Sequence, residues 1–294
     1  MVDTVPDETV GMFISLCRKD RLARYIRFLE VLCICQGKAV RPNQWRVARL
    51  LIEEASDLLI KLRRDPQNGK ILVSGTAEYF PGLSEEGAAP ELHEWLKEAD
   101  DEIRGYFVAL MSLYAALVRG RNKKVTPKLQ RMLPYDIVMT IVMDMNMHAI
   151  ALEVSRQFVR VAIDLWVEND IWSTGSDEPV VVERHSSLVT AKLVRNWEEV
   201  DMLAQSRTLY ARFNLTGSCN WHRFDDLKEF LLRYLERYRT QIASQIVENR
   251  MVLELCRLLH ALINTGFYTT EDLEQIIGPM LMLLDGRQDT ISAD

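Results

Sequence analysis

The chain has 294 residues, of which 48% are hydrophobic, and only 13 glycines and 9 prolines. This composition excludes a disordered chain and supplies enough apolar side chains for a large core. The net charge of -6 argues against a broad nucleic-acid surface, which needs a basic face, and leaves room only for small basic pockets.

Residues 1–12 are acidic and include Pro6, and they lack the charged and apolar regions of a secretory signal. The longest nearly uninterrupted apolar run, from Tyr106 to Val118, is shorter than the roughly 20 residues needed to cross a bilayer. We therefore expect a cytosolic segment that does not insert into a membrane.

A helical pattern begins near residue 22, where apolar residues recur at intervals of four and three and so share one face of a helix. They are Leu22, Ile26, Leu29 and Cys33. We expect Gly37 to be the C-cap of this helix, because a glycine there tolerates a positive φ angle. Pro42 then begins the next helix, so residues 1–63 are predicted to form helical hairpins.

The five cysteines are an odd number without a CxxC pair, which does not predict a disulfide framework. Cys33 and Cys35 are two positions apart, so on a helix their side chains point in nearly opposite directions and cannot easily share a tetrahedral metal. We expect both to be small buried side chains, and we predict neither a metal nor a cofactor.

Residues 64–90 contain three of the nine prolines and four of the thirteen glycines, a density that predicts a surface loop. A second helical segment follows over residues 91–172. Its long helix has the pattern Ile103, Phe107, Leu110, Tyr114 and Leu117. Gly120 is the expected C-cap, and Thr126 followed by Pro127 predicts the start of the next helix.

A cluster of cations follows this helix: Arg119, Arg121, Lys123, Lys124 and Lys128. It could hold a phosphate. Cations are favoured at a helix C-terminus in any case, so a solvated helix end is the preferred interpretation. Acidic residues from Glu98 to Glu102 similarly suit the start of a helix and lack the glycine of a calcium loop.

Residues 173–294 are predicted to be further helical repeats with two polar loops, 173–187 and 206–224. The run VVVE at 180–183 resembles a strand. Apolar spacing predicts helices over the following positions: Leu227, Leu231, Tyr234 and Tyr238; Val252, Cys256, Leu259 and Ile263; Leu273, Ile277, Met280 and Leu284. Gly278 and Pro279 are expected to kink or break the last helix.

Both predicted hairpins share a helix, a glycine turn and a helix that begins with proline. Stacked hairpins of this kind predict an all-α, armadillo-like helical-repeat solenoid, one continuous domain, with a compact helical bundle as the alternative. No hydrolase, nucleotide-binding or metalloprotease motif occurs, which predicts that the chain is not an enzyme. Met132, Met139, Met143, Met145 and Met147 favour core packing over an adaptable contact surface.

The stretch RYIRFLEVLCICQGKAVRPNQ resembles the ryanodine and inositol trisphosphate receptor homology domain, in which a helix leads into a glycine turn and a polar Asn-Gln pair. The matching positions are Leu32, Cys33, Cys35, Gly37, Val40, Asn43 and Gln44. Gln36 differs from the asparagine that is typical of ryanodine receptors.

A later stretch extends the resemblance, which covers roughly residues 10 to 172. It comprises Gly120, Arg121 and Asn122, then Leu133, Pro134, Asp136, Ile137 and Val138, and finally Ile171 and Trp172. None of these motifs is catalytic, and none implies a ligand-binding residue in this chain.

The resemblance implies a cytosolic domain of an intracellular calcium-release channel, an inositol trisphosphate receptor in preference to a ryanodine receptor. Such a channel is expected to be a homotetramer in the endoplasmic reticulum membrane. This segment would lie on the cytosolic face and contact other domains and subunits. The residues alone leave open a stand-alone armadillo-like adaptor that binds a partner's peptide or helix.

Overall fold

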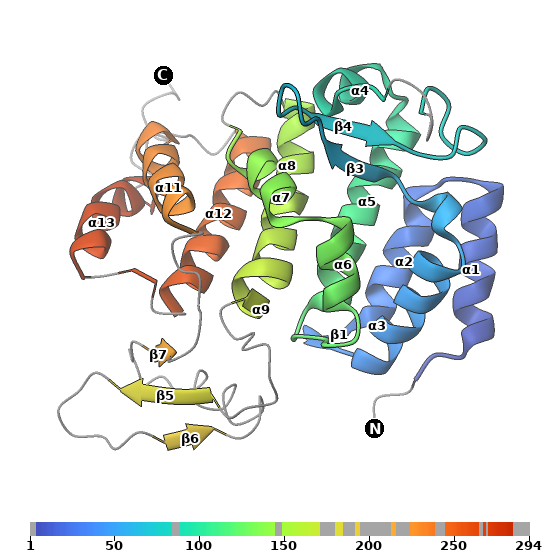
Figure 1. Ribbon diagram of the computed structural model, residues 1–294. Helices are drawn as coiled ribbons and strands as arrows, with labels where there is room; N and C mark the ends of the chain where they lie inside the picture. Colours follow the sequence, from blue (N-terminus) through green and yellow to red (C-terminus); the bar gives the residue numbers. More distant parts are fainter. Residues whose placement is uncertain are drawn as a thin grey trace, which may run out of the picture. The chain divides into compact units, whose positions relative to one another are not determined.

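A computed structural model shows a mostly helical protein, in agreement with the predicted all-α class (Figure 1). The contacts divide the chain into two compact units, Met1–Trp166 and Val167–Asp294, at a point where the sequence predicts one continuous domain. The structure describes residues 4–83, 89–144, 149–170, 180–184, 192–194, 213–215, 224–238, 245–264, 267–268 and 270–284.

The first unit begins with two helices joined by a short turn. The elements that follow are a hairpin of two-residue strands, a helix that continues into a π-helical turn, and a 3-10 turn. In order they are α1 (Asp7–Lys19), α2 (Ala23–Cys33), β1 (Ile34–Cys35), β2 (Lys38–Ala39), α3 (Arg41–Ala48), η1 (Arg49–Glu53) and η2 (Ser56–Leu58).

The rest of the unit is a second hairpin of strands followed by five helices and a π-helical turn. These elements are β3 (Lys61–Arg64), β4 (Ile71–Ser74), α4 (Leu92–Glu98), α5 (Asp101–Val118), α6 (Thr126–Met132), α7 (Tyr135–Val142), α8 (Ala149–Val161) and η3 (Ala162–Val167).

Helix α5 is the centre of this unit. It packs against α2 on one side and α8 on the other, α1 packs on the far side of α2, and α3 and α6 also contact α5 (Figure 1). Every side chain of α5 from Tyr106 to Val118 is buried except Val108. A helix that is apolar on nearly all sides needs neighbours on nearly all sides, which explains its central place.

Strand β4 and the last residue of β3 lie in the region 64–90 that the sequence predicts as a surface loop, and the rest of β3 lies in the segment predicted as helical hairpins. The two strands pair antiparallel from Lys61 opposite Ser74 to Arg64 opposite Ile71. Ile71 and Val73 are buried, and so are Phe80 and Leu83 beyond the hairpin. The prediction of a loop is therefore wrong for this part: the glycines and prolines mark the turns between short ordered pieces that contribute to the core.

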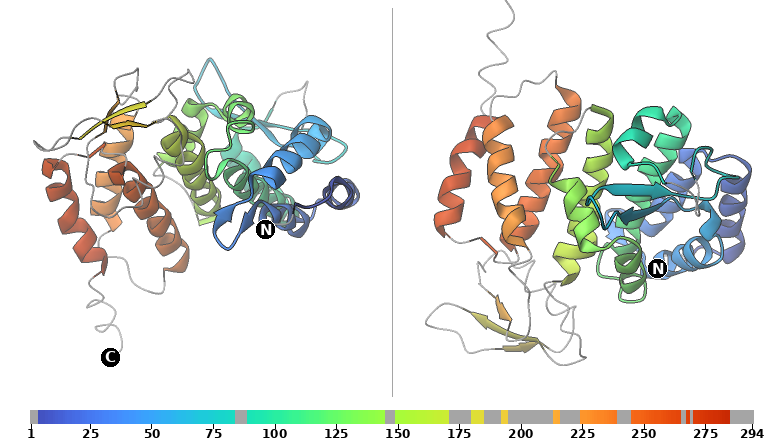
Figure 2. Two further views of the ribbon diagram at one scale, coloured as in Figure 1. Left: turned by 90° about the horizontal axis from the view of Figure 1, so that it is seen from below. Right: turned by 45° about the horizontal axis from the view of Figure 1, so that its top comes forward.

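In the described residues, the second unit has the short helix α9, three longer helices and a small sheet. The elements are α9 (Glu168–Asp170), β5 (Val180–Arg184), β6 (Lys192–Val194), β7 (Phe213–Leu215), α11 (Asp225–Tyr238), α12 (Ile246–Asn264) and α13 (Thr270–Leu284). The sheet is antiparallel with β5 in the centre, which confirms the strand predicted at 180–183. Helix α11 packs against both α12 and α13, and Figure 2 shows the three side by side.

Helix α13 differs from the sequence prediction in two ways. It continues through Gly278 and Pro279, so the break that we predict there as the alternative to a kink does not occur. Its buried side is also turned by one position, since Ile276 is 3% exposed whereas Ile277, predicted to face inward, is 54% exposed. The predicted loops 173–187 and 206–224 lie mostly outside the described residues.

Candidate functional site

The turn of the first matched motif is a β-hairpin. The N–H of Val40 donates to the carbonyl of Cys33 at 2.8 Å, and between them Gln36 and Gly37 have φ angles of 51° and 78°. Two successive residues in the left-handed region are typical of a two-residue type I′ turn. Gly37 is therefore a hairpin residue and not the helix C-cap that the sequence predicts, because α2 already ends at Cys33.

The turn of the second matched motif follows α5. The N–H of Arg121 donates to the carbonyl of Val118 at 3.0 Å, Arg119 is extended, and Gly120 has a φ of 72°. These angles are typical of a type II turn, which favours glycine at its third position. A Cβ atom on Gly120 would lie 2.9 Å from the Cβ of Ala39, so the two turns are in direct contact.

Arg41 connects these two turns. It is the first residue of α3, and its Nε and Nη2 atoms donate to the carbonyl of Gly120 at 3.3 and 2.9 Å. The pair of donors fixes the backbone of the second turn against the end of the first. A bidentate guanidinium contact of this kind also restricts the orientation of the side chain.

Gln44 donates hydrogen bonds to the C-terminal end of α5 from outside the helix. It is fully buried, and its Nε2 donates to the carbonyls of Ala116 and Arg119 at 2.8 and 2.9 Å. Carbonyls in the last turn of a helix have no partner within the helix. A side chain of α3 therefore caps the C-terminus of α5.

Asn122 completes this network. Its Nδ2 donates to Oε1 of Gln44 at 2.9 Å and to the carbonyl of Arg41 at 3.3 Å, while its Oδ1 accepts from the N–H of Lys124 at 3.3 Å. Asn122 is 4% exposed. The sequence-predicted residues Gln44 and Asn122, 78 positions apart, thus meet in one buried polar contact, which we call the Gln44–Asn122 network.

Asn43 reaches in another direction from the same helix. Its Nδ2 donates to the carbonyl of Leu32 at 2.9 Å, and its Oδ1 accepts from the N–H of Val5 at 3.0 Å. The guanidinium of Arg46 donates to the carbonyl of Val5. Asn43 and Gln44 therefore join α3 to the end of α2, to the segment before α1 and to α5.

The other predicted motif residues lie outside this network. Cys33 is buried, and burial raises the pKa of its thiol, whereas Cys35 is exposed on β1, contrary to the prediction that both are buried. Pro134 precedes α7, and Asp136 in its first turn lies 3.7 Å from the Arg64 guanidinium. Trp172 lies outside the described residues.

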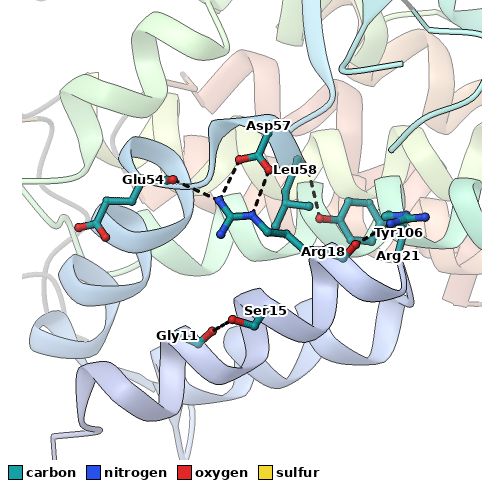
Figure 3. Close-up of polar contacts among 8 residues, drawn as sticks. All are labelled: Gly11, Ser15, Arg18, Arg21, Glu54, Asp57, Leu58 and Tyr106. Carbon is teal, nitrogen blue, oxygen red and sulfur yellow. Dashed lines mark hydrogen bonds and ion pairs between the residues drawn. The ribbon is translucent and has the colours of Figure 1, made fainter. Parts of the chain in front are cut away.

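A second set of contacts, absent from the sequence prediction, joins α1 to η2 and to Glu54, the residue that follows η1 (Figure 3). Both Nε and Nη2 of Arg18 donate to the Asp57 carboxylate at 3.1 Å, and Nη2 also donates to the carbonyl of Glu54 at 3.4 Å. The buried hydroxyl of Tyr106 on α5 donates to the carbonyl of Leu58 at 3.1 Å. The Arg18 guanidinium holds the pKa of the Asp57 carboxyl below its usual range.

The sequence offered only a weak signal for these contacts. Asn43 and Gln44 were identified through the family resemblance alone, because no chemical motif in the sequence includes them. Arg18 and Asp57 follow no spacing that would pair them. In the described ranges, no group of three or more His, Cys, Asp or Glu side chains could hold a metal ion.

The same part of the chain contains no helix that is long and apolar enough to cross a membrane. The residues of the two matched motifs form an arrangement of turns, a helix cap and buried amides. The hydrogen bonds of this arrangement fix α2, α3 and α5 against one another.

Comparison with known proteins agrees with the family resemblance. The model of the RIH domain family matches residues 1–64. The chain is 26% identical over 125 residues to inositol 1,4,5-trisphosphate receptor-like protein A of Dictyostelium discoideum. That alignment covers 42% of this chain and 4% of the relative, so the chain spans only a small part of the length of that protein. Together the two matches show that the chain contains a domain of the RIH and inositol trisphosphate receptor type.

Proposed function

We propose that this chain is a non-catalytic cytosolic domain of an intracellular calcium-release channel of the inositol trisphosphate receptor type. In this proposal it transmits the effect of ligand binding to the pore through contacts with other domains and subunits of a homotetramer. The channel would lie in the endoplasmic reticulum membrane. The similarity to a receptor-like protein supports this context.

The observation that supports the coupling role most is the Gln44–Asn122 network. The residues that carry the family resemblance cap one helix from another and bring the two turns into contact. Packed helices with fixed hydrogen bonds move as rigid pieces, and small rotations between such pieces add up along a stack of repeats. An armadillo-like helical-repeat solenoid is therefore the arrangement that we propose for this chain.

A stand-alone adaptor is the second candidate, and the methionines were its main support. Met139 is buried and Met132 and Met143 are half-buried, while Met145 and Met147 lie outside the described residues. The described methionines therefore resemble core residues more than an open contact surface. A ryanodine receptor segment is a third candidate, which the name of the matched relative does not favour.

An immunoblot of fractionated source cells, with an antibody raised against this chain, separates the channel from the adaptor. The proposal predicts a band far larger than 34.0 kDa in the endoplasmic reticulum membrane fraction. A soluble band near 34.0 kDa would support the adaptor and refute the channel context.

A further inference from the structure

The large hydrophobic side chains that are exposed in the described part of the first unit all lie on the hairpin of α1 and α2. Met12 of α1 is 53% exposed, and Phe28 and Val31 of α2 are 37% and 67% exposed. The two helices are joined by a short turn and lie side by side (Figure 1). Because the solvent side of a surface helix is normally polar, this concentration of apolar side chains indicates a surface that another molecule covers.

The exposed apolar side chains surround a pair of stacked rings. Phe13 and Phe28 are the middle residues of α1 and α2, and their ring centres are 3.8 Å apart with an interplanar angle of 14°. Met12 precedes Phe13 on the exposed side of α1, and Val31 shares one side of α2 with Phe28, since positions three apart are neighbours on a helix. We call the surface of Met12, Phe13, Phe28 and Val31 the hairpin face.

Exposed charges of opposite sign lie at the two ends of the hairpin face. On α1, Glu8 is four positions before Met12 and Lys19 is seven positions after it, so all three share one side of the helix. On α2, Arg24 is four positions before Phe28. Because the two helices of a hairpin run in opposite directions, Lys19 and Arg24 lie at the end with the turn and Glu8 lies at the other end.

These charges are not used within the described part of the chain. The ion pairs of α1 there use Asp7 and Arg18, and no ion pair uses Glu8, Lys19 or Arg24. The helix dipole explains an acid in the first turn of α1 and a cation in its last turn. It does not explain Arg24, because a cation is disfavoured in the first turn of a helix, and α2 has no acid there.

An apolar centre with an acid at one end and cations at the other end is self-complementary. When a twofold axis passes through the stacked rings, the Glu8 end of each copy lies against the Arg24 end of the other copy. A twofold axis creates every contact twice, so two pairs of opposite charges form. Within one copy the two ends are separated by about 16 Å, the rise of the helix from Glu8 to Lys19. Asp20 in the turn lowers the positive charge of its end without reversing it.

We infer that the hairpin face binds the same face of a second copy of this chain. The apolar side chains of the two copies cover one another, and Glu8 of each copy pairs with Arg24 of the other. The face is about 20 Å long and two helices wide, which is small for a permanent interface, so the dimer is weak and depends on concentration. The inference does not depend on the proposed function, because an adaptor and a channel domain could both use such a contact.

The test is sedimentation equilibrium of this full 294-residue chain at protein concentrations from about 5 to about 200 µM. Two charge reversals are compared, Glu8→Lys and Arg24→Glu, and each puts like charges into both contacts of the dimer. The matched controls are Glu102→Lys, which also lies in the first turn of a helix, and Lys97→Glu, which also removes an exposed cation.

We expect each reversal to weaken dimerisation at least about fivefold and each control to change it by less than about twofold, because an exposed charge matters only where it lies at the contact. An equimolar mixture of the two reversed variants should associate within about twofold of the wild type, because both contacts of the mixed pair again join opposite charges. A mixture that does not associate would overturn the inference, and so would a wild-type chain that is monomeric at every concentration.

A second comparison tests the apolar centre without a change of charge. Val31→Ser removes the most exposed side chain of the hairpin face, and Leu253→Ser is the control, since Leu253 is 51% exposed on α12 of the second unit. Val31→Ser should weaken dimerisation at least about fivefold and Leu253→Ser less than about twofold. Equal loss in both would show association without specificity and would overturn the inference. This comparison also decides the matter if circular dichroism shows that a charge reversal prevents folding.

Discussion

The substitution Gln44→Met tests whether the Gln44–Asn122 network stabilises the first unit. Methionine keeps nearly the same length and volume but removes all three hydrogen bonds of the buried amide, two to carbonyls of α5 and one from Asn122. Each buried polar group left without a partner costs about 1–3 kcal/mol. We expect Gln44→Met to lower the free energy of local opening at the C-terminal end of α5 by about 3 kcal/mol. The value lies at the lower end of the sum for three groups, since some of them will find water or a new partner.

Hydrogen–deuterium exchange of peptides from the last turns of α5 is the suitable assay, because it measures this region separately from the second unit. Gln67→Ala, on an exposed loop of the β3–β4 hairpin, is the control and should change exchange by less than about 0.5 kcal/mol. A cost of Gln44→Met below about 1 kcal/mol would refute the reasoning.

A double-mutant cycle sharpens the same prediction. Asn122→Ala alone should cost about 2 kcal/mol, because it removes the donors to Gln44 and Arg41. The double variant should cost about 1 kcal/mol less than the sum of the single variants, since the two residues share one hydrogen bond. Strict additivity would show that the two amides act independently.

Two further predictions concern the turn at Gly120 and the ion pair between Arg18 of α1 and Asp57 of η2. Gly120→Ala should destabilise the first unit by about 1–3 kcal/mol in urea unfolding, because it adds a methyl group at a positive φ where no space exists. Gly11→Ala on α1 should be neutral or slightly stabilising, because an added methyl group there has no atom within 4 Å. The lowered pKa of Asp57 stabilises the fold above the unfolded pKa of about 3.9, and this contribution is lost as the pH falls through the folded pKa. The stability difference between the wild type and Asp57→Asn should therefore shrink from pH 6 to pH 3, and it should stay below about 1 kcal/mol because Arg18 and Asp57 are partly exposed. A difference that grows at low pH would contradict this account.

The long helices were predictable because their apolar spacing is a local property of the sequence. Phe107, Leu110, Tyr114 and Leu117 are all buried on α5, as the spacing predicts. The short strands were not predictable in the same way. Two-residue strands such as β1 and β2 are too short to alternate, and a helix C-cap and a type I′ turn both favour glycine, so Gly37 fitted either structure.

The candidate site was predictable only in part. The family resemblance singled out Asn43, Gln44, Gly120 and Asn122, and the structure brings these residues together around two turns. Which atoms meet depends on how α3 packs on α5, and that packing is set by side chains distant in the sequence. Arg41 was part of the quoted motif but its contact with Gly120 needs the same packing, so no local pattern could reveal it.

The most direct test of the coupling role uses the complete receptor that contains this chain, in microsomes of the endoplasmic reticulum. Inositol trisphosphate binding and calcium release are measured for the wild type, for Gln44→Met and for the control Gln67→Ala. The account predicts that Gln44→Met lowers calcium release by at least about fivefold while ligand affinity stays within about twofold of the wild type, because the domain transmits the signal and does not hold the ligand. Equal loss of binding and release, or no loss of either, would contradict the proposed coupling role.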